Sequence, residues 1–199
     1  MKEGSCNQLA DRWPALPPGA QLVASEAVVE RALARMAAEI TAGFAGTDPL
    51  AITIMQGGLV FAGQLLTRLG FALDCDYIHV QRYGSSTRGG QLKWLAGPHV
   101  SVRDRSVLLL DDILDEGRTL AAVREELLAG GAASVRIAAF ALKERREPPA
   151  IGADYVGIRV PDLFVFGFGM DVDGAWRNLP AIYALAPGSE GRSPVESPA

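Results

Sequence analysis

The sequence predicts an α/β protein in which a mainly parallel, twisted sheet is flanked by helices. Short apolar, strand-like runs alternate along the chain with segments of helical periodicity. The run at 107–110, Val-Leu-Leu-Leu, has no polar alternation, which is typical of a strand buried on both faces of a parallel sheet. The 199 residues, 49% of them hydrophobic, are enough for one sizeable core.

The first half of the chain contains two helix–strand alternations. Ser25 is a candidate N-cap for a helix from about Glu26 to Phe44, whose apolar residues repeat at helical spacing. A buried strand is expected over Pro49–Met55, followed by a helix near 59–69 and a strand from about 73 to 83. This order predicts parallel pairing of the two strands.

The second half continues the same alternation. A polar loop covers 84–90, and a short strand is expected around 93–100. The apolar strand that begins at Val107 leads into a helix near 120–129, and a further apolar run covers 134–142. Together these segments complete the predicted sheet.

We expect a single domain over residues 1–186, because no Pro/Gly/Ser-rich linker divides it. Its core is expected at about 26–150. From residue 154 the pattern changes to short strand-like pieces and turns, so about 151–186, with about 1–25, is predicted to form a small C-terminal/N-terminal hood over the ligand edge. Residues 187–199 are predicted to be a disordered tail.

Composition excludes several classes of partner. The net charge of −4 and the pI near 5.2 give no electrostatic reason to expect nucleic acid or an anionic membrane. Cys6 and Cys75 are too few for a disulfide framework or a metal-binding pattern, which fits a reducing, cytoplasmic location. The N-terminal segment lacks an apolar signal region, and no run approaches the roughly 18 apolar residues of a membrane span.

The segment 107–119, VLLLDDILDEGRT, carries the most specific chemistry. Asp111 and Asp112 follow the buried strand at the edge where parallel sheets bind ligands. The turn after them leads into a helix, and its backbone N–H groups suit a phosphate; the turn consists of Asp115, Glu116, Gly117, Arg118 and Thr119. A solvated acidic turn is the alternative for an acid pair alone, but the whole ordered pattern favours a sugar-phosphate site.

This segment resembles the phosphoribosyl pyrophosphate (PRPP) motif of the type I phosphoribosyltransferases: four hydrophobic residues, two acids, two hydrophobic residues, Asp, a small or polar residue, Gly, any residue and Thr. Every essential position matches. The resemblance implies the fold of that family. It also implies that Asp111 and Asp112 face the ribose hydroxyls and hold Mg²⁺, for which carboxylates are suitable acceptors.

Further segments, from roughly Leu50 to Leu185 and about two thirds of the chain, resemble the hypoxanthine-guanine (6-oxopurine) branch of the family. By this resemblance the loop Gln56-Gly57-Gly58 and Arg177 bind pyrophosphate. Many relatives carry Lys or Arg where this chain has Gln56, so the resemblance implies no strong contact from that side chain.

The resemblance also places a mobile catalytic loop after the strand that ends near residue 83. In the family this loop closes over PRPP and excludes water, which would otherwise capture the ribosyl cation-like state. By composition alone the segment is more typical of a Gly/Ser-rich hairpin loop, and its position in the pattern favours the catalytic loop. The loop begins with Arg82, Tyr83, Gly84, Ser85, Ser86 and Thr87.

The purine site implied by the resemblance uses residues of the last third of the chain. Lys143 donates to the purine 6-oxygen, Phe164 stacks on the base, and Val165 offers main-chain groups to the base edge. The resemblance also counts Asp171 among the purine-binding residues and implies that it contacts the Mg²⁺ ion on the pyrophosphate side. Arg145 and Arg146 are interpreted as a solvated cationic turn.

The activity implied is transfer of the 5-phosphoribosyl group from PRPP to N9 of hypoxanthine or guanine, which gives IMP or GMP and pyrophosphate. Asp115 is the family's candidate for the group that accepts the purine N7 proton. Relatives in this branch are dimers or tetramers, so a homodimer or homotetramer is expected.

The sequence leaves three alternatives. The run Asp171-Val172-Asp173-Gly174 also resembles the nucleophile motif of aspartate-based phosphatases, but too little chain follows it for the large domain that this motif opens. A PRPP-binding regulator without turnover is a second alternative; it is opposed by the presence of the acids, the loop, Lys143 and Arg177, and by a first 25 residues too short for a DNA-binding appendage. A third keeps the transfer but uses xanthine or a pyrimidine as the acceptor.

Overall fold

The computed structural model describes residues 15–82 and 92–186. Its centre is a six-stranded sheet in the order β4-β3-β2-β5-β6-β7. All neighbours pair in parallel except β3 and β4, which are antiparallel. The strands are β2 Pro49–Met55, β3 Asp74–Arg82, β4 Leu92–Ala96, β5 Ser106–Leu114, β6 Ser134–Glu144 and β7 Tyr155–Pro161. The predicted mainly parallel α/β fold is confirmed.

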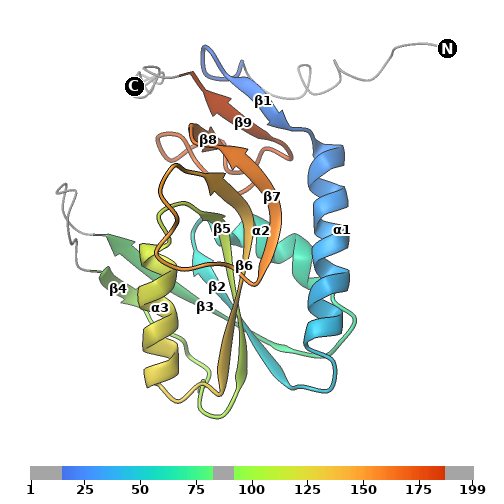
Figure 1. The fold of residues 1–199 in the computed structure, drawn as a ribbon, viewed down its shortest axis with the longest axis vertical. Helices are drawn as coiled ribbons and strands as arrows, with labels where there is room; N and C mark the ends of the chain where they lie inside the picture. The colour runs from blue at the N-terminus through green and yellow to red at the C-terminus, as the bar shows by residue number, and fades with distance from the viewer. Residues whose placement is uncertain (1–14, 83–91, 187–199) are drawn as a thin grey trace, which may run out of the picture.

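Helices cover both faces of this sheet (Figure 1). Helices α1 (Glu26–Gly43) and α2 (Gly58–Leu66) pack on one face, and α3 (Arg118–Ala129) packs on the other. Strand β5 explains the arrangement, because Leu108 and Leu110 belong to the apolar cluster of α1 and α2, whereas Leu109 belongs to the cluster of α3. Its unbroken apolar run is therefore buried on both sides, as predicted.

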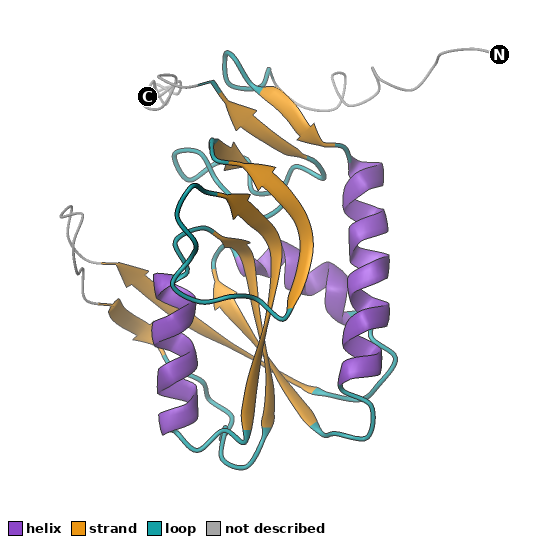
Figure 2. Ribbon diagram, viewed as in Figure 1, coloured by secondary structure: helices purple, strands orange, loops and turns teal. Residues whose placement is uncertain are grey.

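A second, three-stranded antiparallel sheet joins the two ends of the described chain. Its order is β1-β9-β8, with β1 at Gln21–Ala24, β9 at Ile182–Leu185 and β8 at Phe164–Phe166. Figure 2 shows this small sheet beyond the end of the main sheet toward which β5 and β6 point. It occupies the place expected of the hood.

Strand β7 differs from the expectation, because it extends the main sheet and is not part of the hood. Its backbone pairs in parallel with β6, from Ala138↔Tyr155 to Glu144↔Pro161. Arg35 of α1 donates to the carbonyls of Val156 and Gly157. The strand mixes buried and exposed residues, such as the exposed Arg159. For this reason its sequence pattern resembles that of the short strands predicted for the hood.

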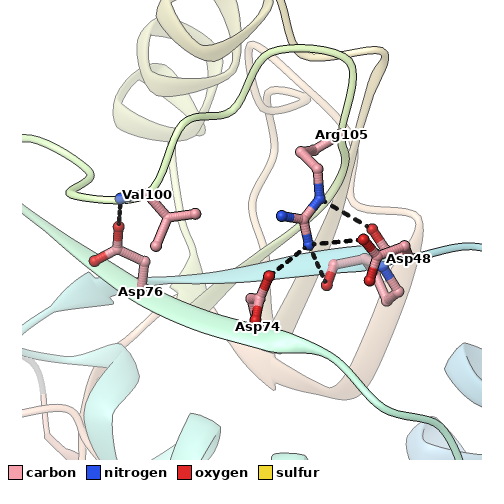
Figure 3. A network of polar contacts seen from close by, with 6 residues as sticks. Asp48, Asp74, Asp76, Val100 and Arg105 are labelled. Carbon is pink, nitrogen blue, oxygen red and sulfur yellow. Dashed lines mark hydrogen bonds and ion pairs between the residues drawn. The ribbon is translucent and has the colours of Figure 1, made fainter.

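A polar network fastens the strand ends away from the hood (Figure 3). Arg105, just before β5, donates to the Asp48 carbonyl at 3.2 Å and to the Asp74 carboxylate at 2.9 Å. Asp76 of β3 accepts backbone N–H groups of the segment after β4, including that of Val100 at 2.7 Å. The network therefore ties together the starts of β2, β3 and β5, and leaves the opposite edge to the loops.

No helix in the described ranges is long and apolar enough to cross a membrane.

Candidate active site

The acid pair Asp111–Asp112 lies near the carboxyl end of β5, in surroundings that disfavour two negative charges. Asp111 accepts the backbone N–H of Asp112 at 3.1 Å. Desolvation, followed by the charge of Asp112, raises the pKa of Asp111 well above its usual value, and desolvation also raises the pKa of Asp112. Such a pair is suited to face a cation or sugar hydroxyls.

The turn after β5 is shaped by Gly117, which precedes α3 with φ of 75°. A Cβ at this position would lie 3.1 Å from the backbone nitrogen of Ile151 and 3.2 Å from that of Ala150, so the turn and the β6–β7 loop are in close contact. Helix α3 begins at Arg118. The N–H groups of its first turn therefore lie directly after the acidic turn, as in anion sites at helix N-termini.

A cavity of about 320 Å³ opens at this turn. Of the residues predicted for the sugar-phosphate site, all line it except Arg118, whose side chain lies 3.4 Å from the Glu116 carboxylate. The cavity is lined by Asp111, Asp112, Ile113, Asp115, Glu116, Gly117, Thr119, Leu120 and Arg145. The structure thus gathers the predicted acids and the phosphate turn around one space.

Asp115 is held between two cations. Lys143, near the end of β6, lies 2.8 Å from Asp115 Oδ2, and Arg145 contacts Oδ1. Partial burial raises the pKa of Asp115, but the hydrogen bonds and charges of Lys143 and Arg145 outweigh it, and the pKa lies below its usual value. Asp115 is therefore ionised over a wide pH range.

The interpretation of Arg145 as part of a solvated turn is wrong, because its side chain is paired with Asp115. Arg146 is exposed, as expected. The side chain of Arg145 reaches back to the carboxylate at the end of the neighbouring strand. The signal that the sequence offers is the spacing, because Arg145 follows Lys143 by only two residues at the end of the strand.

The Gln56-Gly57-Gly58 loop lies against Asp112. The peptide bond before Gln56 is cis, and the Gln56 side chain is exposed. A methyl group at Gly57 would overlap the Asp112 carboxylate, and one at Gly58 would lie 3.0 Å from the carbonyl of Leu110. Only glycine permits this approach, so the loop predicted to bind pyrophosphate is in direct contact with the acid pair.

The loop between β8 and β9 completes this side of the site. Arg177 donates to the carbonyl of Gly169 at 2.7 Å and pairs with the Asp171 carboxylate at 2.6 Å. A methyl group at Gly169, where φ is 105°, would overlap the carbonyl of Gly57 and would lie 3.3 Å from Cβ of Asp112. The charge of Arg177 acts to lower the pKa of Asp112, against the larger effect of desolvation.

Of the residues predicted for the base, Lys143 lies on β6 of the main sheet, whereas Phe164 and Val165 lie on β8 of the small sheet. Lys143 is paired in register with Val160 of β7, and the chain then turns into β8. Phe164, the first residue of β8, is 37% exposed although it is a large apolar side chain, whereas Val165 is buried. An exposed aromatic ring at this edge can serve as a stacking surface.

Comparison with known proteins agrees with this geometry. The model of the phosphoribosyl transferase domain matches residues 21–173. The chain belongs to the phosphoribosyltransferase family.

Within that family the similarity is to the hypoxanthine-guanine branch. The chain is 34% identical to the hypoxanthine-guanine phosphoribosyltransferase of Bacillus subtilis over 168 residues, which are 84% of this chain and 93% of the relative. It is also 34% identical to the enzyme of that name from Streptococcus mutans over 151 residues, 75% of this chain and 84% of the relative. A crystal structure of a hypoxanthine phosphoribosyltransferase from Staphylococcus aureus superposes with a TM-score of 0.81 at 25% identity, and covers 94% of this chain and 100% of that one.

For a phosphoribosyltransferase, the donor set of the acid pair fits a divalent cation. Desolvation and mutual repulsion destabilise two adjacent ionised carboxylates, and a cation would remove that cost. Within 15–82 and 92–186, however, no three His, Cys, Asp or Glu side chains are grouped closely enough to hold a metal. The Asp171 carboxylate pairs with Arg177 and accepts the N–H of Gly174.

The predicted mobile loop lies almost wholly beyond the described residues of this phosphoribosyltransferase. Arg82 is the last residue of β3. The rest of the predicted loop falls outside the described ranges: Tyr83, Gly84, Ser85, Ser86 and Thr87.

Proposed function

We propose that this phosphoribosyltransferase moves the 5-phosphoribosyl group of PRPP to N9 of hypoxanthine or guanine, which gives IMP or GMP and pyrophosphate. The observation that carries the proposal is the junction of β5 and β6. There the acid pair and phosphate turn of a sugar-phosphate site adjoin the Asp115–Lys143 pair, which can recognise a base. The similarity to hypoxanthine-guanine enzymes supports the same activity.

The sugar-phosphate half of PRPP is assigned to the 320 Å³ cavity. Amides of the turn at 115–119 and the start of α3 face the 5′-phosphate, and Thr119 adds a hydroxyl donor. Asp111 and Asp112 accept from the two neighbouring ribose hydroxyls. Their negative charge also stabilises positive charge that develops on the ribose in the transition state.

The pyrophosphate half is assigned to the loop that contacts Asp112. The amides of Gly57 and Gly58 offer donors, and Arg177 supplies a permanent positive charge that the Gly169 carbonyl and Asp171 hold in place. Gln56 brings no charge. Asp111, Asp112 and Asp171 are the residues that would hold Mg²⁺. When bound there, Mg²⁺ neutralises charge on the leaving pyrophosphate.

The base is assigned to the space beside Lys143. Lys143 has three donors and favours the 6-oxygen of hypoxanthine or guanine over the 6-amino group of adenine. Phe164 stacks on the ring, and backbone groups of Val165 meet the base edge. Asp115 accepts the N7 proton. The lowered pKa of Asp115 before substrate binds makes it a weak base, but one that is already ionised when substrate arrives.

The organisation of the molecule is part of the proposal. We infer one domain over residues 1–186, with the small sheet as a hood, and assembly into a homodimer or homotetramer. The loop that begins at Arg82 is assigned to closure over PRPP, and water exclusion there would favour transfer over hydrolysis. PRPP, the oxopurine, pyrophosphate and the nucleotide product are the expected partners, with no role for nucleic acid or membrane.

Two alternatives are separated by one experiment. The purified protein is incubated with PRPP, Mg²⁺ and one base from the set hypoxanthine, guanine, xanthine, adenine and uracil, and pyrophosphate release is measured. Release with hypoxanthine or guanine is expected. Release with xanthine or uracil alone would reassign the acceptor, and absence of release with every base would favour a PRPP-binding regulator and contradict the proposed transfer.

A further inference from the structure

Each oxygen of the Asp115 carboxylate has its own cation. Lys143 lies 2.8 Å from Oδ2, and Arg145 contacts Oδ1. Arg145 lines both the sugar-phosphate cavity and an adjoining cavity of about 390 Å³, and Lys143 lines only the second. Arg145 therefore stands between the two spaces, with its guanidinium on Asp115.

The double pairing conflicts with the roles proposed for Lys143 and Asp115. If Lys143 donates to the purine oxygen, it gives up part of its interaction with Asp115 at the moment when Asp115 must approach the purine N7. A carboxylate that loses its partner is reoriented, and its pKa rises in a partly desolvated site. Arg145 contacts the other oxygen and is not needed by the base.

We propose that Arg145 is a positioning residue for the transfer reaction: it keeps the Asp115 carboxylate in place, ionised and directed at the base after Lys143 has turned to the purine oxygen. This inference rests on the proposed function. A planar guanidinium suits the task, because it holds a carboxylate in a defined orientation and cannot be deprotonated near neutral pH.

The backbone makes Arg145 a rigid support. Its N–H donates to the carbonyl of Lys143 at 3.0 Å, which forms a tight turn directly after the strand. Farther along the same β6–β7 loop, the N–H of Ala150 donates to the carbonyl of Glu116 at 2.8 Å. The loop that carries Arg145 is therefore bound to the turn that carries Asp115 by a backbone contact that does not involve the Lys143 side chain.

The charges around Asp115 make Arg145 the principal counter-ion once Lys143 is engaged. Among the described residues that line the sugar-phosphate cavity, Arg145 is the one basic side chain. Besides Asp115, the acids on the same cavity are Asp111, Asp112 and Glu116, and Asp162 acts on Arg145 from the segment between β7 and β8. Arg118 at the start of α3 lies against Glu116. The remaining acids all oppose the ionised form of Asp115.

The test compares Arg145→Gln and Arg145→Lys with Arg146→Gln, a matched loss of the exposed neighbouring arginine. Turnover with PRPP and hypoxanthine is measured over a range of pH. In Arg145→Gln we expect kcat to fall by roughly tenfold or more, KM for PRPP to change by less than about twofold, and the acidic limb of the kcat profile to move to higher pH. Arg145→Lys should restore part of the limb position, and Arg146→Gln should match the wild type.

An acidic limb in Arg145→Gln that coincides with that of the wild type would overturn the proposal, whatever the loss of rate. A rise in KM for PRPP with an unmoved limb would likewise overturn it and make Arg145 a direct phosphate ligand. Lack of pyrophosphate release by the wild type would reject the proposed function instead. The inference on Asp115 would still be tested by titrating its ¹³C-labelled carboxyl group, whose pKa should be higher in Arg145→Gln and unchanged in Arg146→Gln.

Discussion

Lys143 Nζ lies 2.8 Å from Asp115 Oδ2, so the ends of β6 and β5 are joined by an ion pair at the place proposed for the base. The parallel pairing of the two strands ends at Leu114↔Leu142. Asp115 and Lys143 are the next residues of the two segments. The sheet therefore delivers a donor for the purine oxygen and an acceptor for the purine proton at nearly the same depth.

Replacement of the acceptor tests its role in proton transfer. Asp115→Asn keeps the shape of the side chain but removes the charge that accepts a proton, so kcat should fall by roughly 10²- to 10⁴-fold. PRPP affinity, measured by calorimetry, should be largely kept because the turn amides remain. Near-normal turnover would remove Asp115 as the base.

Replacement of the donor tests the choice of base. Lys143→Met has a similar length and no donor, so kcat/KM for hypoxanthine should fall by roughly 100-fold or more, whereas the slow reaction with adenine should change little. The ratio of the two specificity constants is the measurement. Equal losses for both bases would show that Lys143 supports the fold of the site and does not read the 6-oxygen.

The sequence was sufficient for features that are local in the chain. The buried strand β5 and the turn from Asp115 to Thr119 follow from the apolar run, the acids and Gly117, which are neighbours in the sequence. Features that depend on distant segments were harder to predict. Arg145 reaches Asp115 across a strand boundary, and β7 joins the main sheet through backbone pairing that side-chain pattern does not specify.

The contact of three segments at Asp112 shows the same limit. Gly57 was predicted to bind pyrophosphate, but its role as the residue that makes room for the Asp112 carboxylate appears only in three dimensions. Gly169 makes room in turn for the carbonyl of Gly57. The sequence alone therefore does not predict which atoms lie close to a glycine, because those atoms belong to distant segments.

Close approach at Gly57 predicts that Gly57→Ala displaces the Asp112 carboxylate. Overpacking of this kind costs about 1–3 kcal/mol, and we expect it mainly as a weaker affinity for PRPP with Mg²⁺. The control is Gly63→Ala in α2, where the added Cβ meets nothing within 4 Å beyond its chain neighbours and the backbone of its own helix. It should leave binding unchanged and stabilise the protein by about 0.5–1 kcal/mol. Equal PRPP affinity in both variants would contradict the contact.

The carboxylate of Asp76, shown in Figure 3, predicts a pH-dependent contribution to stability. Desolvation raises the pKa of Asp76, but the hydrogen bonds from the N–H groups of Val100, Tyr77 and His99 together have the larger effect. The pKa of Asp76 therefore lies below its ordinary value of 3.8. The stabilisation is therefore present above the ordinary pKa and is lost as pH falls through the lower pKa of the folded state.

Asp76→Asn should reduce the free energy of unfolding by about 1–3 kcal/mol near neutral pH, because the amide turns a donor toward N–H groups or leaves one unpaired. Urea unfolding at a series of pH values should show the difference from the wild type shrinking as the solution becomes more acidic. Glu125→Gln, an exposed change on α3, should stay within about 0.5 kcal/mol of the wild type. A pH-independent deficit in Asp76→Asn would argue against the ionic origin.

The exposed ring of Phe164 predicts a specific loss of base affinity. Phe164 is 37% exposed at the start of β8, and Leu185 is its partner in register on β9. Stacking of a base on an aromatic ring contributes about 1–3 kcal/mol, so Phe164→Ala should weaken binding of hypoxanthine roughly 5- to 150-fold. PRPP affinity should be unchanged. Leu22→Ala removes another exposed apolar side chain from the same small sheet and should affect neither ligand. If both variants weaken hypoxanthine binding equally, the small sheet supports the site as a whole and Phe164 has no separate contact with the base.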